Sequence, residues 1–273
     1  MDENKNETID ENQHAYDNGF HPKEVHLKPN YKFYRTSFGY KLWNKCLVYM
    51  FKFFMFFPKF LFWGTRVKGK KNKKYVKGAM IVSNHVYPFD IFIILTSIPT
   101  KRIYVTTLES NMGFGFVSTF FRDGGAVPIP TNTNLLLRFN RETPEMIKKG
   151  YNVLFYPEAA LIPYCDHVRQ MLPGAFHFAY SSTKKIIPTV ITFHKPKGLY
   201  KLFRRNKPCI HYNFLEPYYM EDLGNKRLTI NKARDDIQKI MADYFIKNSD
   251  YYYDENGNRN DTPIPSKKKK GKK

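Results

Sequence analysis

From residue 79 onward, short apolar runs alternate with longer stretches that have helical periodicity. The predicted strands are 79–83, 102–107, 125–129, 152–156, 186–193 and 209–217. The predicted helical stretches are 89–98, 112–121 (a helix or a turn), 133–149, 174–183 and 226–247. Because strands that alternate with helices are typical of α/β folds, we predict an α/β domain with a mixed, mostly parallel sheet covered by helices.

The segment before these strands, residues 42–63, reads LWNKCLVYMFKFFMFFPKFLFW. Its length suits a membrane span, but a lysine at the centre of a spanning helix costs roughly 2.5–3.5 kcal/mol. Lys45, Lys52 and Lys59 recur at seven-residue steps and form one stripe. This pattern favours an amphipathic helix that lies in the membrane interface, with the lysines facing headgroups. The alternative is a core helix whose lysines snorkel to water.

The charge distribution divides the chain into four parts. The net charge is +21, from 45 Lys and Arg against 24 Asp and Glu. We predict a disordered acidic arm (1–30), a membrane-docking segment (31–65), the main domain (66–248) and a disordered basic tail (249–273). The basic run 66–77 and the net charge favour an anionic membrane surface as partner. Nucleic acid is not expected, because the aromatic residues are packed together and no nucleic-acid motif occurs.

The cysteines and histidines give no sign of a disulfide framework or of a metal site. The three cysteines are widely spaced and odd in number, which favours a reducing compartment. Cys165 and His167 form a pair, but a zinc site needs about four ligands and no second pair lies at a suitable spacing. We therefore expect no metal.

The sequence NHVYPFD (84–90) places a histidine and an aspartate where a predicted strand gives way to a predicted helix. With His85 in the connecting loop and Asp90 in the first helical turn, the carboxylate can orient the imidazole as a general base. The alternative is a hydrogen-bonded local turn without a chemical role. Glu158 follows another predicted strand, so it can meet His85 in one cleft at the carboxyl ends of the strands.

NHVYPFD also resembles the NH-x4-D motif of the glycerolipid acyltransferase superfamily, which includes 1-acylglycerol-3-phosphate acyltransferases. Three further blocks are similar to those of the family and occur in the family's order. They are GFGFVSTFFRDGGAVPIP (113–130), VLFYPEAALIP (153–163) and KKIIPTVITF (184–193). The resemblance covers roughly residues 79–193.

The resemblance implies an O-acyltransferase that moves a fatty acyl group from a thioester to a hydroxyl of a lysophospholipid-like acceptor. The donor would be acyl-coenzyme A or an acyl carrier protein, and no other cofactor is implied. His85 would act as general base and Asp90 would orient it, while Arg122 and Glu158 match positions that bind the acceptor. Such an enzyme is expected at the cytoplasmic face of a membrane, as a peripheral or monotopic protein.

The third block departs from the family pattern. Ala159, Ala160 and Leu161 stand where the family often has Gly, Thr and Arg. A guanidinium binds phosphate bidentately and leucine cannot. Arg122, Arg169 or Lys184 are alternative cations for an acceptor phosphate, unless the acceptor has no terminal phosphate monoester. The altered block also supports a rival function, that of an inactive basic membrane-binding protein on the same scaffold.

Overall fold

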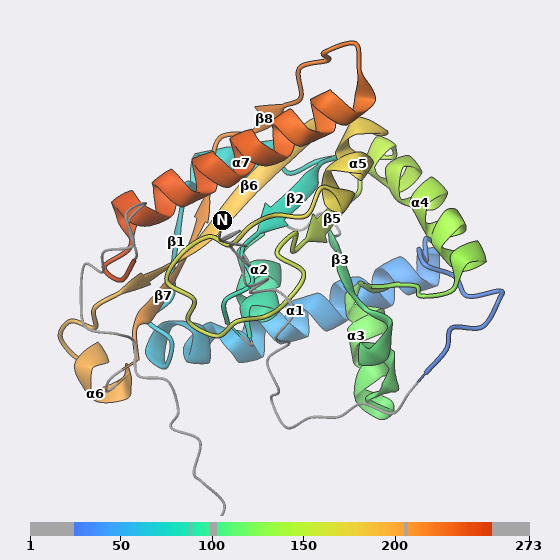
Figure 1. The fold of residues 1–273 in the computed structure, drawn as a ribbon. Helices are drawn as coiled ribbons and strands as arrows, with labels where there is room; N and C mark the ends of the chain where they lie inside the picture. Colours follow the sequence, from blue (N-terminus) through green and yellow to red (C-terminus); the bar gives the residue numbers. More distant parts are fainter. Residues whose placement is uncertain (1–24, 88, 99–102, 205–206, 253–273) are drawn as a thin grey trace, which may run out of the picture.

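The computed structural model describes residues 25–87, 89–98, 103–204 and 207–252, which form one sheet with flanking helices (Figure 1). The strands are β1 (Arg66–Lys68), β2 (Met80–Ser83), β3 (Ile103–Leu108), β4 (Ala126–Ile129), β5 (Asn152–Phe155), β6 (Lys185–His194), β7 (Cys209–Phe214) and β8 (Tyr218–Tyr219). Their order is β1-β7-β6-β2-β5-β3-β4, with β8 beside β6. Only the pairs β6–β7 and β6–β8 are antiparallel among the described strands. The predicted mixed, mostly parallel sheet is confirmed.

The helices form two groups around this sheet. They are α1 (Phe38–Leu61), η1 (Lys70–Tyr75), α2 (Asp90–Ser97), η2 (Glu109–Gly113), α3 (Phe116–Gly124), α4 (Thr133–Lys148), α5 (Gly174–Tyr180), α6 (Tyr200–Arg204) and α7 (Lys226–Asn248). α5 packs between α4 and α7, α4 packs on β5 and α7 packs on β6, whereas α1 packs on α2 and α3. Figure 1 shows α7 along one side of the sheet and α1 on the other.

The sequence explains the central strands and the helix ends. β2 and β5 are buried at every position, as expected for strands that are covered on both faces of a parallel sheet. The Asn132 side chain caps α4 by accepting hydrogen bonds from the N–H groups of Asn134 and Leu135. That helix is followed by Gly150 at a φ of 90°, a conformation that favours glycine.

Short elements and segment ends differ from the sequence predictions. β1, η1 and α6 were not predicted, because their lysine-rich or brief sequences have no clear periodicity. The predicted strand 209–217 divides into β7 and β8, since Pro217 lies between them. The predicted helix or turn 112–121 is the end of η2 followed by α3.

The two predicted disordered ends lie largely outside the described residues. Of the arm 1–30, residues 25–30 are described, and the Leu27 N–H donates to Glu109 Oε1 over 2.7 Å. Of the tail 249–273, residues 249–252 are described, and Ser249 Oγ hydrogen-bonds with the backbone of Phe193. These contacts attach both described ends to the main domain.

Helix α1 lies against the domain, with its lysine stripe turned partly inward. Lys52 Nζ donates to the Ile98 carbonyl over 3.2 Å, and Lys59 Nζ donates to the hydroxyls of Thr96 and Ser97. The prediction of an exposed lysine stripe along α1 is therefore wrong for Lys52 and Lys59, which turn toward α2, whereas Lys45 is exposed. The physical reason is that the C-terminal end of α2 offers unpaired carbonyls and the negative end of a helix dipole, which attract cations.

The side of α1 away from the domain carries aromatic residues. Phe53 is 73% exposed and Phe57 is 70% exposed. In the part of the chain that the structure describes, none of the helices has the combined length and apolar character needed for a membrane span.

Candidate active site

The NHVYPFD segment begins where the ladder between β2 and β6 ends. The last backbone pair of the two strands is Ser83 with Thr189. Beyond it, Asn84 Nδ2 donates to the Ile191 carbonyl over 3.1 Å, and Asn84 Oδ1 accepts from the Ile191 N–H over 2.8 Å. The buried amide thus takes the place of a backbone pair and fixes the loop that carries His85.

His85 and Asp90 form the hydrogen-bonded pair that the sequence predicted. His85 Nδ1 lies 2.7 Å from Asp90 Oδ2, with Asp90 at the first residue of α2. The Asp90 side chain is 1% exposed, whereas that of His85 is 24% exposed. With the proton on Nδ1 facing a carboxylate, Nε2 keeps its lone pair. The ring therefore offers a basic nitrogen that solvent can reach from one side.

Tyr156 completes the surroundings of the pair. Its hydroxyl donates to Asp90 Oδ1 over 3.0 Å, and its ring stacks on that of His85 with a centroid distance of 4.1 Å. Burial and the nearby Asp90 charge raise the pKa of Tyr156 well above its usual range. The phenol therefore stays protonated and acts as a donor. Asp90 has one oxygen on the histidine and one on the tyrosine, so both rings are held in fixed positions.

Glu158 lies on the other side of the His85 backbone. Its Oε2 accepts from the His85 N–H over 3.1 Å, and its Oε1 accepts from the Arg169 N–H over 3.1 Å. Arg169 Nη2 also donates to Glu158 Oε2 over 2.8 Å and to the Ala160 carbonyl. Burial raises the pKa of Glu158, although Arg169 and the two backbone N–H groups act in the opposite direction. This fully buried ion pair connects the His85 loop to the loop that follows β5.

Part of the chain is similar to a known family of enzymes. Residues 64–192, which contain His85, Asp90 and Glu158, match the family model described as Acyltransferase. This match over part of the chain supports the predicted resemblance to the glycerolipid acyltransferase superfamily. The same match supports the predicted enzyme class, an O-acyltransferase.

A solved acyltransferase has a similar fold. It is the 1-acyl-sn-glycerophosphate (LPA) acyltransferase PlsC from Thermotoga maritima, with a TM-score of 0.54 and 17% sequence identity. The likeness covers 77% of this chain and 88% of that chain, and at this identity it supports the fold. A search of curated protein sequences gave no match.

Arg122, another predicted site residue, lies in surroundings that differ from those of the His85–Asp90 pair. Arg122 lies in the last turn of α3, where its carbonyl accepts from the Tyr40 hydroxyl over 2.6 Å. Contacts that join it to His85 or Glu158 are not found within the described residues. Its role in acceptor binding stays a prediction. The same role for Glu158 also stays a prediction, but both of its carboxylate oxygens are bound to protein groups.

Two of the three alternative cations for an acceptor phosphate already form ion pairs with carboxylates of the protein. Arg169 is buried against Glu158. Lys184 precedes β6, whereas His85 follows β2, and these parallel neighbours place the two residues at opposite ends of the sheet. Lys184 Nζ also lies 2.6 Å from Asp222 Oδ2. Lys184 is therefore wrong as a candidate for this role. Of the three cations, Arg122 is left to bind an acceptor phosphate.

Sequence reasoning missed Asn84 and Tyr156 as parts of the site. The available signal was their position, because Asn84 directly precedes the histidine and Tyr156 directly precedes the Pro-Glu pair of the third block. Neither position reveals the partner, since Asn84 reaches β6 and Tyr156 reaches α2 only in the folded sheet.

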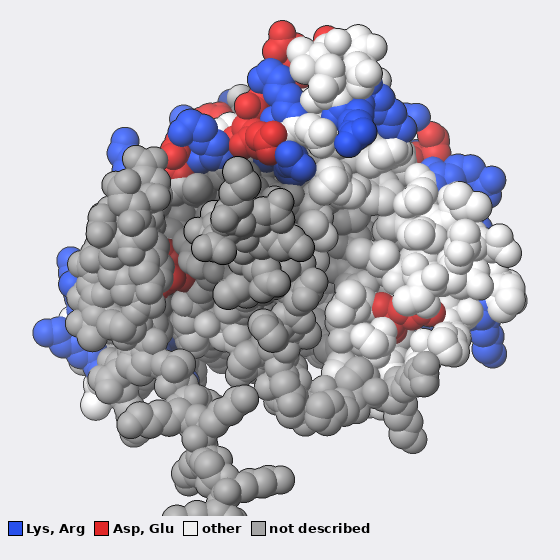
Figure 2. Space-filling model, in the orientation of Figure 1, with Lys and Arg blue, Asp and Glu red and all other residues white. Residues whose placement is uncertain are grey.

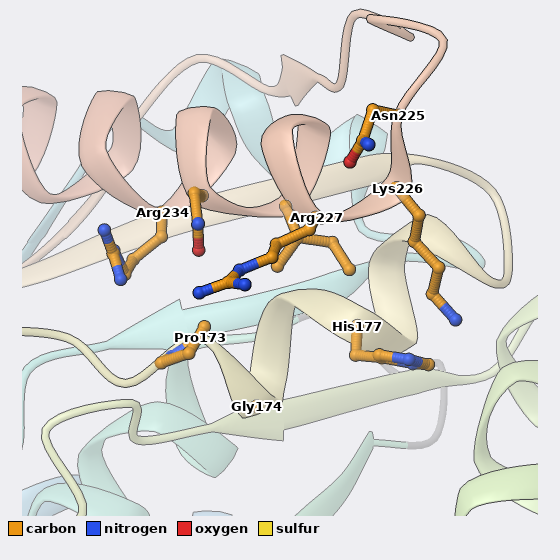
Figure 3. Close-up of a pocket in the computed structure, with 9 residues that line it drawn as sticks. Pro173, Gly174, His177, Asn225, Lys226, Arg227 and Arg234 are labelled. Atoms are coloured by element: carbon orange, nitrogen blue, oxygen red, sulfur yellow. The ribbon is translucent and has the colours of Figure 1, made fainter.

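A pocket of about 690 Å³ lies apart from this site, between α5 and α7. Figure 3 shows Arg227 extending from α7 toward Pro173 at the start of α5, the helix that carries His177. Arg234 is paired with Asp235 at 2.8 Å. His85, Asp90 and Glu158 are not among the residues that line this pocket, so its cations do not belong to the His85 site.

Proposed function

We propose that this acyltransferase is membrane-associated and acylates a hydroxyl of a lysophospholipid similar to 1-acylglycerol 3-phosphate. The acyl donor is a thioester, either acyl-coenzyme A or an acyl carrier protein. The observation that carries the proposal is the 2.7 Å contact between His85 Nδ1 and Asp90 Oδ2, which leaves Nε2 of a partly exposed ring as a base. The similar fold of PlsC, an LPA acyltransferase, supports this class of acceptor.

The proposed reaction needs only one base and one thioester. His85 Nε2 removes the proton of the acceptor hydroxyl as its oxygen attacks the thioester carbonyl. The C–S bond breaks, and the imidazolium returns the proton to the leaving thiolate. Asp90 stabilises the imidazolium while it exists. Since the acceptor oxygen attacks directly, no covalent enzyme intermediate is required.

An exposed aromatic surface supports an approach from the membrane. Trp63, which follows α1, stacks on Phe89 with a centroid distance of 5.7 Å, and Phe89 directly precedes Asp90. Large apolar side chains are also exposed on α1, on α3 and at or next to α6: Phe53, Phe54, Phe57, Phe116, Val117, Leu199 and Leu202. Figure 2 shows uncharged side chains beside a small acidic patch near α3, whereas charged side chains of both signs are interspersed over α7. An apolar surface next to the dyad suits an interfacial enzyme at the cytoplasmic face.

Arg122 is the cation that we assign to the acceptor headgroup. Its Nε is buried and has no hydrogen-bond partner within the described ranges. A guanidinium donor without a protein partner suits an acidic oxygen of a ligand. This assignment replaces the arginine that the third block lacks.

Incubation of the purified chain with radiolabelled acyl-coenzyme A and a panel of lysolipids tests the proposed reaction. We expect acylated product with lysophosphatidic acid or a closely related acceptor. The rival function, an inactive membrane-binding protein, predicts binding to vesicles without turnover of any lysolipid. Product formation would exclude the rival, and its absence with both donor types would exclude the proposed reaction.

Tyr156→Phe tests the positioning of the dyad by the phenol. The variant keeps the stacked ring and removes the hydrogen bond to Asp90. Since a hydrogen bond to a charged group contributes about 1.5–3 kcal/mol, we expect kcat to fall by roughly 10- to 100-fold. KM for the acceptor should change little, because the hydroxyl does not reach the substrate. A variant with an unchanged kcat would show that Tyr156 does not position Asp90.

A further inference from the structure

A second cluster of cations lies between α1, η1 and α2, at the end of α2 that is distant from Asp90. It surrounds a pocket of about 350 Å³. The polar lining consists of Lys52, Lys59, Lys70, Lys73, Thr96 and Ser97. The lining residues include no acidic side chain. The pocket therefore concentrates positive charge in a partly enclosed space.

Lys59 is the buried member of this cluster. It is 5% exposed, and its Nζ donates to Thr96 Oγ1 over 3.0 Å and to Ser97 Oγ over 2.8 Å. Burial lowers the pKa of Lys59 from its usual value of 10.5 to about 8, and the charges of Lys73 and Lys52 act in the same direction. Burying an ammonium without a counter-charge costs free energy.

The described part of the chain supplies no carboxylate partner for these four lysines. Among the described residues, the observed ion pairs join none of the four lysines to a carboxylate. An anion in the pocket would supply the missing charge.

Helix η1 holds two of the lysines in place. Asn72 Nδ2 donates to the Phe214 carbonyl over 3.2 Å, and Lys71 Nζ lies 2.9 Å from Glu216 Oε1. At Gly69, a Cβ atom would lie 2.0 Å from the same Phe214 carbonyl oxygen, so the close approach of η1 to β7 requires glycine. The cluster is thus part of a fixed framework, and its cations need little ordering when an anion binds.

The rim of the pocket is apolar and continues onto the exposed aromatic surface of α1. Phe56 and Phe60 line the pocket, are 56% and 42% exposed, and have ring centroids 5.2 Å apart. An occupant with an anionic head and apolar chains can use both features. A small soluble anion would leave the aromatic rim unused.

This pocket is separate from the proposed acceptor site. Ser97 lies seven residues after Asp90 in α2, which corresponds to roughly 10 Å along a helix axis. In a lysophospholipid such as lysophosphatidic acid, the free hydroxyl and the phosphate are separated by only two carbons. One small headgroup therefore cannot place its hydroxyl at His85 and its phosphate between these lysines.

We propose that the pocket formed by Lys52, Lys59, Lys70 and Lys73 binds the phosphate of an anionic membrane phospholipid that is not the acceptor. The proposal rests on the membrane association proposed above. A bound lipid would neutralise the lysines and hold α1, η1 and α2 at the membrane surface, so that the aromatic residues of α1 face the acyl chains.

Vesicle binding by two matched double variants of the full chain tests this proposal. Lys70→Gln/Lys73→Gln removes two charges from the pocket. Lys74→Gln/Lys77→Gln removes two charges from the same basic segment at exposed positions that do not line the pocket. Binding is measured with phosphatidylcholine vesicles and with vesicles that also contain phosphatidylglycerol. We expect the pocket variant to bind the anionic vesicles about 10-fold more weakly than the control variant, while both bind neutral vesicles equally.

Three results bear on the proposal in separate ways. Equal weakening of both variants on anionic vesicles would show a diffuse surface-charge effect and overturn the pocket assignment. Saturable binding of inorganic phosphate to the wild-type chain, lost in the pocket variant, would overturn the lipid as occupant. Acyl transfer in neutral detergent micelles should be the same in both variants, so this proposal can fail while the proposed reaction holds.

Discussion

His85→Ala is expected to lower kcat for acyl transfer by roughly 10²- to 10⁴-fold, because the acceptor hydroxyl loses the base that removes its proton. The fold should survive. The ring is partly exposed, and its loop is held by Asn84 and by the backbone N–H of residue 85, which the variant keeps. Steady-state rates with acyl-coenzyme A and lysophosphatidic acid measure the effect.

His177→Ala provides the matched control for this variant. His177 is exposed on α5 and is not part of the dyad, so the same substitution there should leave kcat unchanged. Circular dichroism of both variants checks the fold. Retention of most activity in folded His85→Ala would show that His85 is not the base.

Glu158→Gln is expected to destabilise the protein by about 3–5 kcal/mol, because it leaves the buried Arg169 guanidinium without its counter-charge. For a domain of this size the loss corresponds to a fall in Tm on the order of 10 °C. The loop that carries His85 should also lose order, since the Glu158 carboxylate accepts its backbone N–H. Thermal unfolding followed by circular dichroism measures the change.

A double variant and an exposed control show how much of the lost stability comes from the Glu158–Arg169 ion pair. Glu158→Gln/Arg169→Met removes both charges and should recover much of the lost stability. Glu145 forms an exposed pair with Lys148, so Glu145→Gln should change the free energy of unfolding by less than about 0.5 kcal/mol. Equal small effects at positions 145 and 158 would contradict a structural role for the Glu158–Arg169 pair.

The sequence predicted the fold class and the dyad because both follow from local patterns. Strands that alternate with helices imply the mixed sheet, and a histidine just before a helix meets an aspartate in its first turn. Glu158 was predicted to meet His85, and its carboxylate does contact the His85 backbone. Its role in acceptor binding stays a prediction, and its carboxylate is engaged within the protein by Arg169.

Other features depend on partners that a linear pattern does not reveal. The lysine stripe of α1 was visible, but periodicity does not show which side of a helix faces the domain. The C-terminal end of α2 determines this, because it accepts hydrogen bonds from Lys52 and Lys59. The pairing of Arg169 with Glu158 crosses an irregular loop with positive φ angles at Ala159 and Tyr164, which no sequence period predicts.

Nitrogen NMR of histidine-labelled wild-type protein tests most directly whether His85 is poised as a base. The His85 signals are assigned by their loss in His85→Ala, and the spectrum is recorded where the ring is neutral. The geometry predicts a proton on Nδ1, held by Asp90, and a free lone pair on Nε2. A neutral ring protonated on Nε2 would contradict the assignment of His85 as the general base.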